Sequence, residues 1–361
     1  MDSSTITADV GAARSDGSAR RVVHAVLAEA RRDWALFVAV GLYTVVVWAF
    51  CGALGRPGFF HPLVYMSAWS IGLVAWLGLY VLFRDLPPAL RADRVHPMQA
   101  FAARLKPYAT PKFAAGVLLF LASGLFTGTF TSAKTLMSDV VPFHDDVMLA
   151  KLDAALFMGL DPWRALQPVL GHPLITRAIQ NIYLSGWTAL LVGMLAAVIF
   201  SPRLKPVRMR FFIIYFAGWI ILGNILAATF LSGGPVYYAA LTGDHARFGP
   251  LVQYLSFSDG LLNSSVTIQH KLWNLRQHHQ MQMGTGISAF PSLHVAMTTL
   301  FALTAFHFDR RLGWVMSALA VVIFLGSVHL AWHYAIDGYA SAAFVMAAWF
   351  GLARLKPRPA A

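Results

Sequence analysis

The chain has little charge and almost no cysteine. Of its 361 residues, 12% are charged and 58% are hydrophobic, whereas soluble domains carry about 25% charged residues. This shortage of charge excludes an ordinary soluble domain and indicates an integral membrane protein. The single cysteine, Cys51, cannot form an internal disulfide and leaves the redox compartment open.

Sequence signatures of nucleotide-binding folds are also missing. The chain has neither a Gly-x4-Gly-Lys phosphate loop nor a dinucleotide-binding glycine fingerprint. It also has no heptad run and no convincing internal repeat. His270, His278 and His279 lack the carboxylate partners and spacing of a metal site. We therefore expect neither a metal nor another cofactor.

What the chain does have is long apolar runs. Windows of about 19 residues identify eight segments of a length that suits a hydrocarbon core about 30 Å thick. They cover residues 34–54, 62–83, 114–133, 179–200, 211–232, 289–308, 312–331 and 336–353. The sequence therefore predicts an all-α fold, a polytopic membrane helix bundle with about eight transmembrane helices.

Basic residues exceed acidic ones by 28 to 16, which gives a formal net charge of +12. If eight segments cross the membrane, the clusters of Lys and Arg all fall on one side, and most Asp residues fall on the other. The positive-inside rule makes the basic side cytoplasmic, with the N and C termini there. Membrane topology and lipid contact thus explain the basic excess, and binding to nucleic acid is not needed.

The same pattern divides the chain into four parts. We expect a cytoplasmic tail and interfacial helix at 1–33, of which the first 19 residues form a disordered tail. Two transmembrane helices and a cytoplasmic loop follow at 34–113, then a larger membrane domain at 114–353 and a basic cytoplasmic tail at 354–361.

Two polar motifs interrupt the later apolar segments. In the run Pro291–His294, Ser292 precedes an apolar helix and is expected to be its N-cap. The free amides of that first turn suit a phosphate, and His294 is placed to act as a general acid. The alternative is a capped helix whose histidine merely meets water and lipid headgroups.

The second motif pairs His333 with Asp337, four residues later. This spacing puts both on one helix face, so Asp337 can fix the tautomer of His333 and leave the other ring nitrogen free as a nucleophile. The alternative is a structural ion pair. The topology places His294, His333 and Asp337 at the outer face together with two long connections, 134–178 and 233–288. Asp145, Asp146 and Asp153 are interpreted as a solvated acidic face, with ligands for a metal or a headgroup as the alternative.

These motifs resemble the type 2 phosphatidic acid phosphatase superfamily, whose three motifs are Lys-x6-Arg-Pro, Pro-Ser-Gly-His and Ser-Arg-x5-His-x3-Asp. The resemblance makes His294 the residue that protonates the leaving group, His333 the nucleophile and Asp337 its carboxylate partner. Lys134 begins a stretch with the spacing of the first motif. Val141 and Ser327, however, stand where the family has arginines that bind phosphate.

Losing two arginines should weaken binding of a doubly charged phosphate monoester more than binding of a phosphodiester. Together with the Asp161–Trp163 and Gly234–Tyr238 runs, this departure is similar to the branch of the inositol phosphorylceramide synthases. We expect Lys134 to bind the phosphate in place of the arginines; the alternative is a lysine that only extends to the membrane interface. The remaining candidates for substrate binding are Ser292, Gly234, Tyr237 and Tyr238.

The resemblance implies a metal-independent enzyme that transfers a phospho-headgroup between lipids through a phosphohistidine. Its partners would be the bilayer, a phospholipid donor and a lipid hydroxyl acceptor. With water as acceptor the same site would be a lipid phosphatase or phosphodiesterase. A proton-coupled transporter and a catalytically silent scaffold are the alternatives from other classes. We expect a bacterial inner membrane, with the active site on its periplasmic face.

Overall fold

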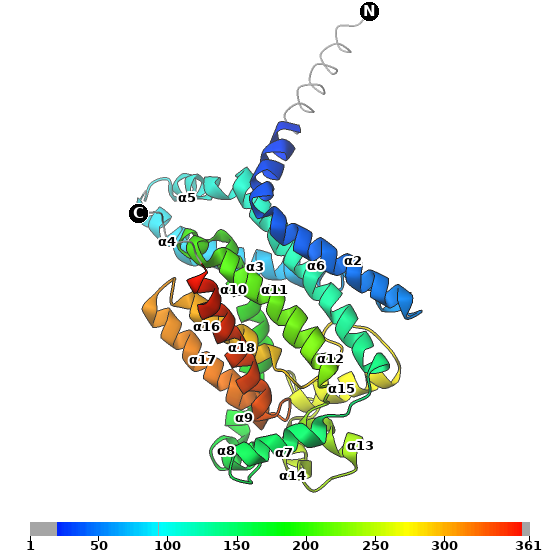
Figure 1. Cartoon of the computed structure of the whole chain (residues 1–361). Helices are drawn as coiled ribbons and strands as arrows, with labels where there is room; N and C mark the ends of the chain where they lie inside the picture. Colours follow the sequence, from blue (N-terminus) through cyan, green and yellow to red (C-terminus); the bar gives the residue numbers. More distant parts are fainter. Residues whose placement is uncertain (1–19, 93, 356–361) are drawn as a thin grey trace, which may run out of the picture.

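The computed structural model describes residues 20–92 and 94–355, and every regular element in these ranges is a helix (Figure 1). The prediction of an all-α fold is thereby confirmed for these residues. The expectations for the tail at 1–19 and for the end of the basic tail at 356–361 lie outside the described residues.

Seventeen α-helices are labelled in chain order. They are α2 (Trp34–Ala53), α3 (Met66–Arg84), α4 (Leu86–Ala92), α5 (Pro97–Leu105), α6 (Pro111–Val140), α7 (Asp146–Leu156), α8 (Pro162–Leu170), α9 (Pro173–Asn181), α10 (Trp187–Phe200), α11 (Arg208–Ala217), α12 (Ala227–Thr229), α13 (Tyr238–Thr242), α14 (Gly249–Leu255), α15 (Ser265–Gln277), α16 (Leu293–Ala305), α17 (Arg310–His329) and α18 (Ala335–Arg354). Two π-helical stretches, Ile182–Gly186 and Gly218–Leu226, join α9 to α10 and α11 to α12.

Within the described ranges, seven helical stretches are long and apolar enough to cross a membrane. They are Arg20–Ala53, Met66–Ala92, Pro111–Val140, Pro173–Phe200, Pro202–Thr229, Arg310–His329 and Ala335–Arg354. The segment predicted at 289–308 forms only the 13-residue helix α16, because the backbone before Leu293 is not helical. That is short of the roughly 20 residues that usually span a bilayer.

Local capping determines where the helices of the bundle begin. The Thr110 side chain accepts a hydrogen bond from Phe113 N before α6, and Asp309 accepts from Arg311 N and Leu312 N before α17. The predicted N-cap is confirmed at α16, where Ser292 Oγ accepts from Val295 N. Each cap supplies an acceptor for an amide that the first helical turn leaves unpaired.

Two apolar cores lie at different levels of the bundle. The larger one joins α2, α3, α6, α10, α11 and α16, and is rich in aromatic rings such as Phe126, Phe211 and Tyr215. The second joins α7 and the segment 238–266 to the ends of α17 and α18, through residues such as Leu149, Leu251 and Tyr334. This second core anchors the loop between α17 and α18, which carries His333.

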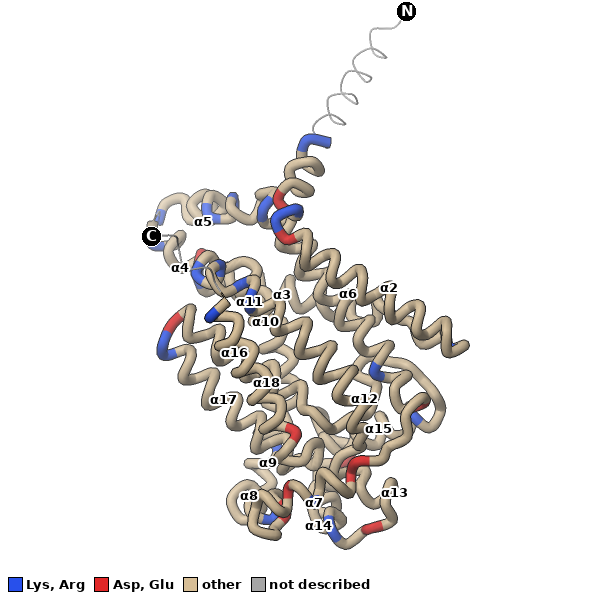
Figure 2. The backbone as a smooth tube through the Cα atoms, viewed as in Figure 1, with Lys and Arg blue, Asp and Glu red and all other residues tan. Residues whose placement is uncertain are grey.

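Lys and Arg gather mainly at one end of the bundle (Figure 2). Figure 2 shows Lys and Arg gathered around α4, α5, the start of α11 and the connection from α16 to α17. We call this the basic end. The Asp residues of α7 and of the loops near α13 and α14 lie at the opposite end, together with the loop that joins α17 to α18 (Figures 1 and 2). We call this the site end.

Candidate functional site

His333 and Asp337 form a buried pair at the start of α18. His333 Nδ1 lies 3.1 Å from Asp337 Oδ2, and the two side chains are 10% and 0% exposed. The same Oδ2 accepts a hydrogen bond of 3.1 Å from Tyr334 N, so Asp337 also caps its own helix. A carboxylate with two partners in a buried place has a fixed orientation, and it therefore fixes the imidazole plane of His333.

The loop that carries His333 is tightly folded. The carbonyl oxygen of Ser327 accepts hydrogen bonds from Trp332 N at 3.0 Å and from His333 N at 3.1 Å. Ala331 takes a left-handed conformation, with φ of 59°, to make this turn. Because non-glycine residues rarely adopt such a conformation, the surrounding contacts must hold it in place.

The run Pro291–His294 lies directly beside this loop. Ser292 N donates to the carbonyl oxygen of Asp337 at 3.3 Å, which ties the two motifs together. The rings of His294 and His333 have centroids 6.5 Å apart. The structure thus brings His294, His333, Asp337 and Ser292 together.

Two aromatic side chains that the sequence did not single out hold His294. Its ring stacks on Tyr183 at 4.4 Å with an interplanar angle of 13°, and it contacts Trp187 at 4.2 Å. Trp187 Nε1 also lies 3.4 Å from the carbonyl oxygen of His294. Tyr183 belongs to the π-helical stretch Ile182–Gly186, a feature that often occurs at functional sites. The sequence signal for these two residues was a pair of aromatic side chains four residues apart within an apolar span.

Asp146 links three parts of the site. Its carboxylate accepts hydrogen bonds of 2.8 Å each from Gly233 N, Gly234 N and the Tyr334 hydroxyl. Asp146 is 3% exposed, so its interpretation as part of a solvated acidic face is wrong. It connects the loop after α12 to the residue that follows His333.

Asp153 corrects the same interpretation at a second place. It is 3% exposed and accepts hydrogen bonds of 2.7 Å from Ala335 N and from Ile336 N. A carboxylate at the first turn of α18 satisfies two amides that would otherwise be unpaired and interacts favourably with the helix dipole. Burial raises the pKa of this carboxyl to about 6, against those two hydrogen bonds.

Lys134 approaches the site from α6. It makes no hydrogen bond or ion pair with any described residue, and its positive charge acts on both His294 and His333. Gly286 packs on it so closely that a Cβ there would lie 2.7 Å from Lys134 Cγ. Burial lowers the pKa of His333, and the charge of Lys134 lowers it further. The His333 ring is therefore neutral at pH 7, as a nucleophile requires.

The other proposed binding residues occupy supporting positions. Gly234 has a φ of +92°, and a Cβ there would lie 2.6 Å from the carbonyl oxygen of Trp332. Tyr237 is 6% exposed, and its hydroxyl donates to the carbonyl oxygen of Gln269. Tyr238 is 4% exposed and packs edge-on against Phe248. Neither tyrosine presents an open surface to a lipid headgroup, so both serve here to hold the loop after α12.

Val141 and Ser327, which stand where the family has phosphate-binding arginines, bring no cation to the site. Val141 packs in a small cluster with Met137 and Leu231, and the buried Ser327 hydroxyl donates to the carbonyl oxygen of Phe324. Arg247, on the connection from α13 to α14, is already paired with Asp161 at 2.6 Å.

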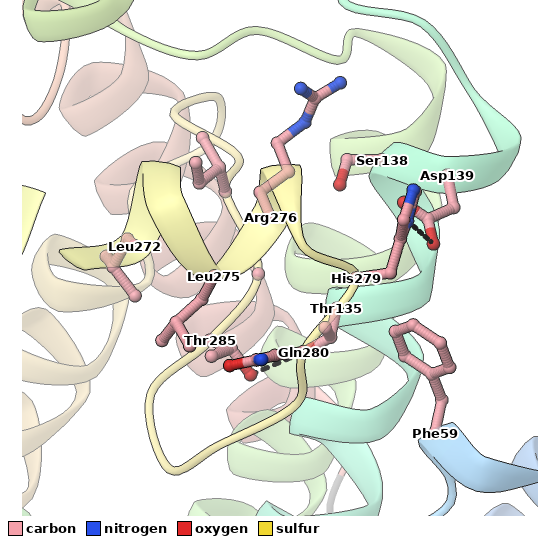
Figure 3. Close-up of a pocket in the computed structure, with 12 residues that line it drawn as sticks. Phe59, Thr135, Ser138, Asp139, Leu272, Leu275, Arg276, His279, Gln280 and Thr285 are labelled. Carbon is pink, nitrogen blue, oxygen red and sulfur yellow. Dashed lines mark hydrogen bonds and ion pairs between the residues drawn. The ribbon is translucent and has the colours of Figure 1, made fainter. Parts of the chain in front are cut away.

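A narrow cavity lies next to Lys134, between α6 and α15. Figure 3 shows Asp139 and His279 facing each other on its wall, with Thr135 and Thr285 below and Arg276 set apart from that pair. None of His294, His333 and Asp337 lines this cavity, and Gly286 stands between it and the Lys134 side chain. It is therefore a neighbour of the site and not its substrate pocket.

An all-helical apolar bundle with a buried His–Asp pair opposite a second histidine defines a polytopic membrane protein with a candidate phosphoryl-transfer site. The family model of the PAP2 superfamily matches residues 147–351, which is more than half of the chain, and the protein belongs to that superfamily. Its members are phosphatases or phosphotransferases acting on lipid phosphates. Searches of curated proteins and of solved structures gave no significant match.

Proposed function

We propose that this protein transfers a phospho-headgroup from a membrane phospholipid to the hydroxyl group of a second lipid, as an inositol phosphorylceramide synthase does. The observation that carries the proposal is the arrangement of His333, held by Asp337 at 3.1 Å, opposite His294 with ring centroids 6.5 Å apart. Two imidazoles this close can act on the same phosphate group, one as the nucleophile on phosphorus and the other as the acid at the leaving oxygen.

In the first step His333 attacks the phosphorus of the donor phosphodiester. Because Nδ1 faces Asp337, the attacking atom is Nε2. The bond from phosphorus to the lipid oxygen breaks, and His294 donates a proton to the departing alkoxide. Asp337 stabilises the positive charge that appears on the His333 ring as the phosphohistidine forms.

In the second step the phosphohistidine gives its phospho-headgroup to the acceptor. His294, now neutral, takes the proton of the acceptor hydroxyl, whose oxygen attacks phosphorus and releases His333. The stacked rings of Tyr183 and Trp187 hold the His294 ring in one orientation for both proton transfers. The residues therefore return to their starting protonation states after one cycle.

Lys134 and the first turn of α16 supply the groups that receive the phosphate oxygens. Lys134 is a single cation without a partner among the described residues, where related sites have two further arginines. A phosphodiester carries about one negative charge, which one lysine and the amides capped by Ser292 can offset. This charge balance supports a diester donor over a phosphate monoester.

The site end is assigned to the periplasmic face of a bacterial inner membrane. The gathering of Lys and Arg at the basic end supports this orientation through the positive-inside rule. The same distribution supports eight membrane crossings, of which α16 is the short one. The connection from α16 to α17 lies at the basic end, while His294, at the start of α16, lies at the site end.

Product analysis with purified protein in liposomes, without added metal, tests the function. The donors are phosphatidic acid and phosphatidylinositol, each offered with and without ceramide or diacylglycerol. We expect a new headgroup-bearing lipid that requires the added acceptor and is lost in His333→Ala. Release of free phosphate or headgroup without an acceptor would replace transfer by hydrolysis at the same site. If no product depends on His333, the phosphoryl-transfer mechanism is wrong.

A further inference from the structure

Residues 146–175, which we call the site-end segment, turn their acidic side chains inward. Asp146, Asp153 and Asp161 are 3%, 3% and 8% exposed. The exposed charged side chains of this segment are both basic, Lys151 and Arg164. Arg164 Nε lies 3.9 Å from Asp161 Oδ2, whereas Lys151 has no ion pair among the described residues. A surface that buries its carboxylates and exposes cations suits a negatively charged partner.

The exposed surface of the same segment is also strongly apolar. Met158 is 99% exposed at the tip of a turn where it has a φ of 56° and Gly159 has a φ of 90°. Further large apolar side chains with exposed fractions of 40% to 75% are Leu156, Leu160, Val169, Leu174 and Ile175. An apolar surface of this extent rarely faces water in a soluble environment.

Helix α7 shows how the two faces are separated. Asp146, Leu149, Ala150 and Asp153 are buried and recur with the period of one helix face. Leu152 and Leu156 lie on the other face and are 45% and 59% exposed. One face of α7 therefore holds the loop of His333, and the opposite face has no partner among the described residues.

We propose that the site-end segment rests on the lipid leaflet at the site end, with Met158 inserted among the headgroups of anionic phospholipids. The exposed apolar surface continues directly into the membrane-crossing stretch Pro173–Phe200, since Leu174 and Ile175 belong to its first turn. Figure 1 shows α8 beside α9, and α8 packs on α17, another crossing helix. An amphipathic surface with basic residues beside its apolar side chains is typical of segments that lie in the membrane interface.

This position would place the leaflet next to the reacting histidines. Because α7 binds the amides of Ala335 and Ile336 through Asp153, the helix that contacts lipid is also the helix that positions the start of α18. A lipid donor would thus leave the leaflet beside a surface that is already part of the site.

Fluorescence quenching in nanodiscs tests this position without depending on turnover. The buried Cys51 is first removed as Cys51→Ala. A single environment-sensitive fluorophore is then attached at Met158→Cys or at Val169→Cys. His245→Cys is the matched control, since His245 is also exposed but lies on the polar connection between α13 and α14. Nitroxide-bearing phospholipids and aqueous iodide serve as the two quenchers, and both faces of a nanodisc are open to iodide.

For Met158 and Val169 we expect nitroxide lipid to quench at least twofold more than for His245, and iodide to quench less. The difference should grow when anionic phospholipid is added to the disc. Equal quenching by iodide at Met158 and His245, with no effect of nitroxide lipid, would place the segment in water and overturn the proposal. Protection of Met158 from both quenchers would overturn it as well, because a second copy or another protein would then cover the surface.

Discussion

The hydroxyl of Tyr334 donates a 2.8 Å hydrogen bond to the carboxylate of Asp146, a residue 188 positions earlier in the chain. Tyr334 is the neighbour of His333 and is 1% exposed, so this bond is shielded from water. It fixes the loop between α17 and α18 to α7. The direction in which His333 faces therefore depends on a helix far from it in sequence.

Weakening this link should reduce turnover. In Asp146→Asn a side-chain NH2 group replaces one of the two carboxylate oxygens. One of the three buried donors then loses its acceptor, which costs about 1–3 kcal/mol. A misplacement of the His333 loop by about 1 Å costs on the order of 100-fold in rate. We expect kcat to fall by 10- to 100-fold with a smaller change in KM. Asp244→Asn, an exposed acid at the same end, is the control and should behave as the parent protein. A purely structural role for Asp146 would instead lower the yield of folded protein and leave kcat per folded molecule unchanged.

Removal of either histidine should abolish transfer. General acid–base catalysis contributes about 10²- to 10⁴-fold, so His294→Ala is expected to lose at least that factor, and His333→Ala should lose all phosphohistidine formation. The loss of activity in Asp337→Asn should lie between the losses in the two histidine variants, because asparagine remains a polar partner of His333 but lacks the charge. His279 offers a matched control, since its Nδ1 also lies 3.0 Å from a carboxylate, that of Asp139. A loss in His279→Ala equal to that in His333→Ala would show that any His–Asp pair matters here, and would contradict the assignment.

Lys134 should act on substrate binding more than on the chemical step. Lys134→Met removes the positive charge and is expected to raise KM about tenfold or more, whereas Lys134→Arg keeps the charge and should retain most binding. Lys271→Met changes an exposed cation of α15 and is the control. If Lys134→Met leaves KM unchanged for every phospholipid donor, another group receives the phosphate.

A methyl group at Gly234 should disturb the site, whereas one at Gly243 should not. Both glycines have positive φ, 92° and 79°, but a Cβ at Gly234 would lie 2.6 Å from the Trp332 carbonyl oxygen, and one at Gly243 meets nothing within 4 Å. Both variants carry the same kind of backbone strain. We therefore expect Gly234→Ala to lose activity at least tenfold more than Gly243→Ala, measured per folded molecule. Equal losses would mean that backbone conformation alone matters.

Asp153 should make stability depend on pH in a particular direction. Its pKa is raised to about 6 in the folded protein, above the value of about 3.9 for an unfolded chain. The folded state then binds more protons between these values, so stability falls as the pH rises from about 4 to 6. In Asp153→Asn this contribution disappears. We expect the Tm of the parent protein, measured relative to Asp153→Asn in the same detergent, to decrease over that window. A relative Tm that rises with pH would show that the carboxylate is favoured in its charged form.

The sequence was sufficient for features that depend on local chemistry. Hydropathy located the helical stretches that are long and apolar enough to cross a membrane, and the spacing of His333 and Asp337 predicted a pair that the structure contains. Ser292 was identified as an N-cap because serine before an apolar helix satisfies free amides. The apolar segment at 289–308 was extended too far towards the N-terminus, since hydropathy does not register that the backbone turns before Leu293.

The sequence was insufficient where a residue's partner lies far away in the chain. Asp146 and Asp153 are seven residues apart on the face of α7 that also carries Leu149 and Ala150. That pattern does indicate a buried face. It does not show that the hydrogen-bond donors to these carboxylates belong to Gly233, Gly234 and the start of α18. Tyr183 likewise reaches His294 by way of a π-helical turn, and regular helical spacing does not foresee such a turn.

The link between Asp146 and Tyr334 also bears on how the protein can be divided. The PAP2 match begins at residue 147, one position after Asp146 and after the whole of α6, which carries Lys134. A fragment cut at that boundary would retain both histidines yet leave the Tyr334 hydroxyl and the amides of Gly233 and Gly234 without their acceptor. The smallest fragment that keeps the site complete therefore starts before α6. Chimaeras built to exchange lipid preference between relatives should be joined ahead of Thr110.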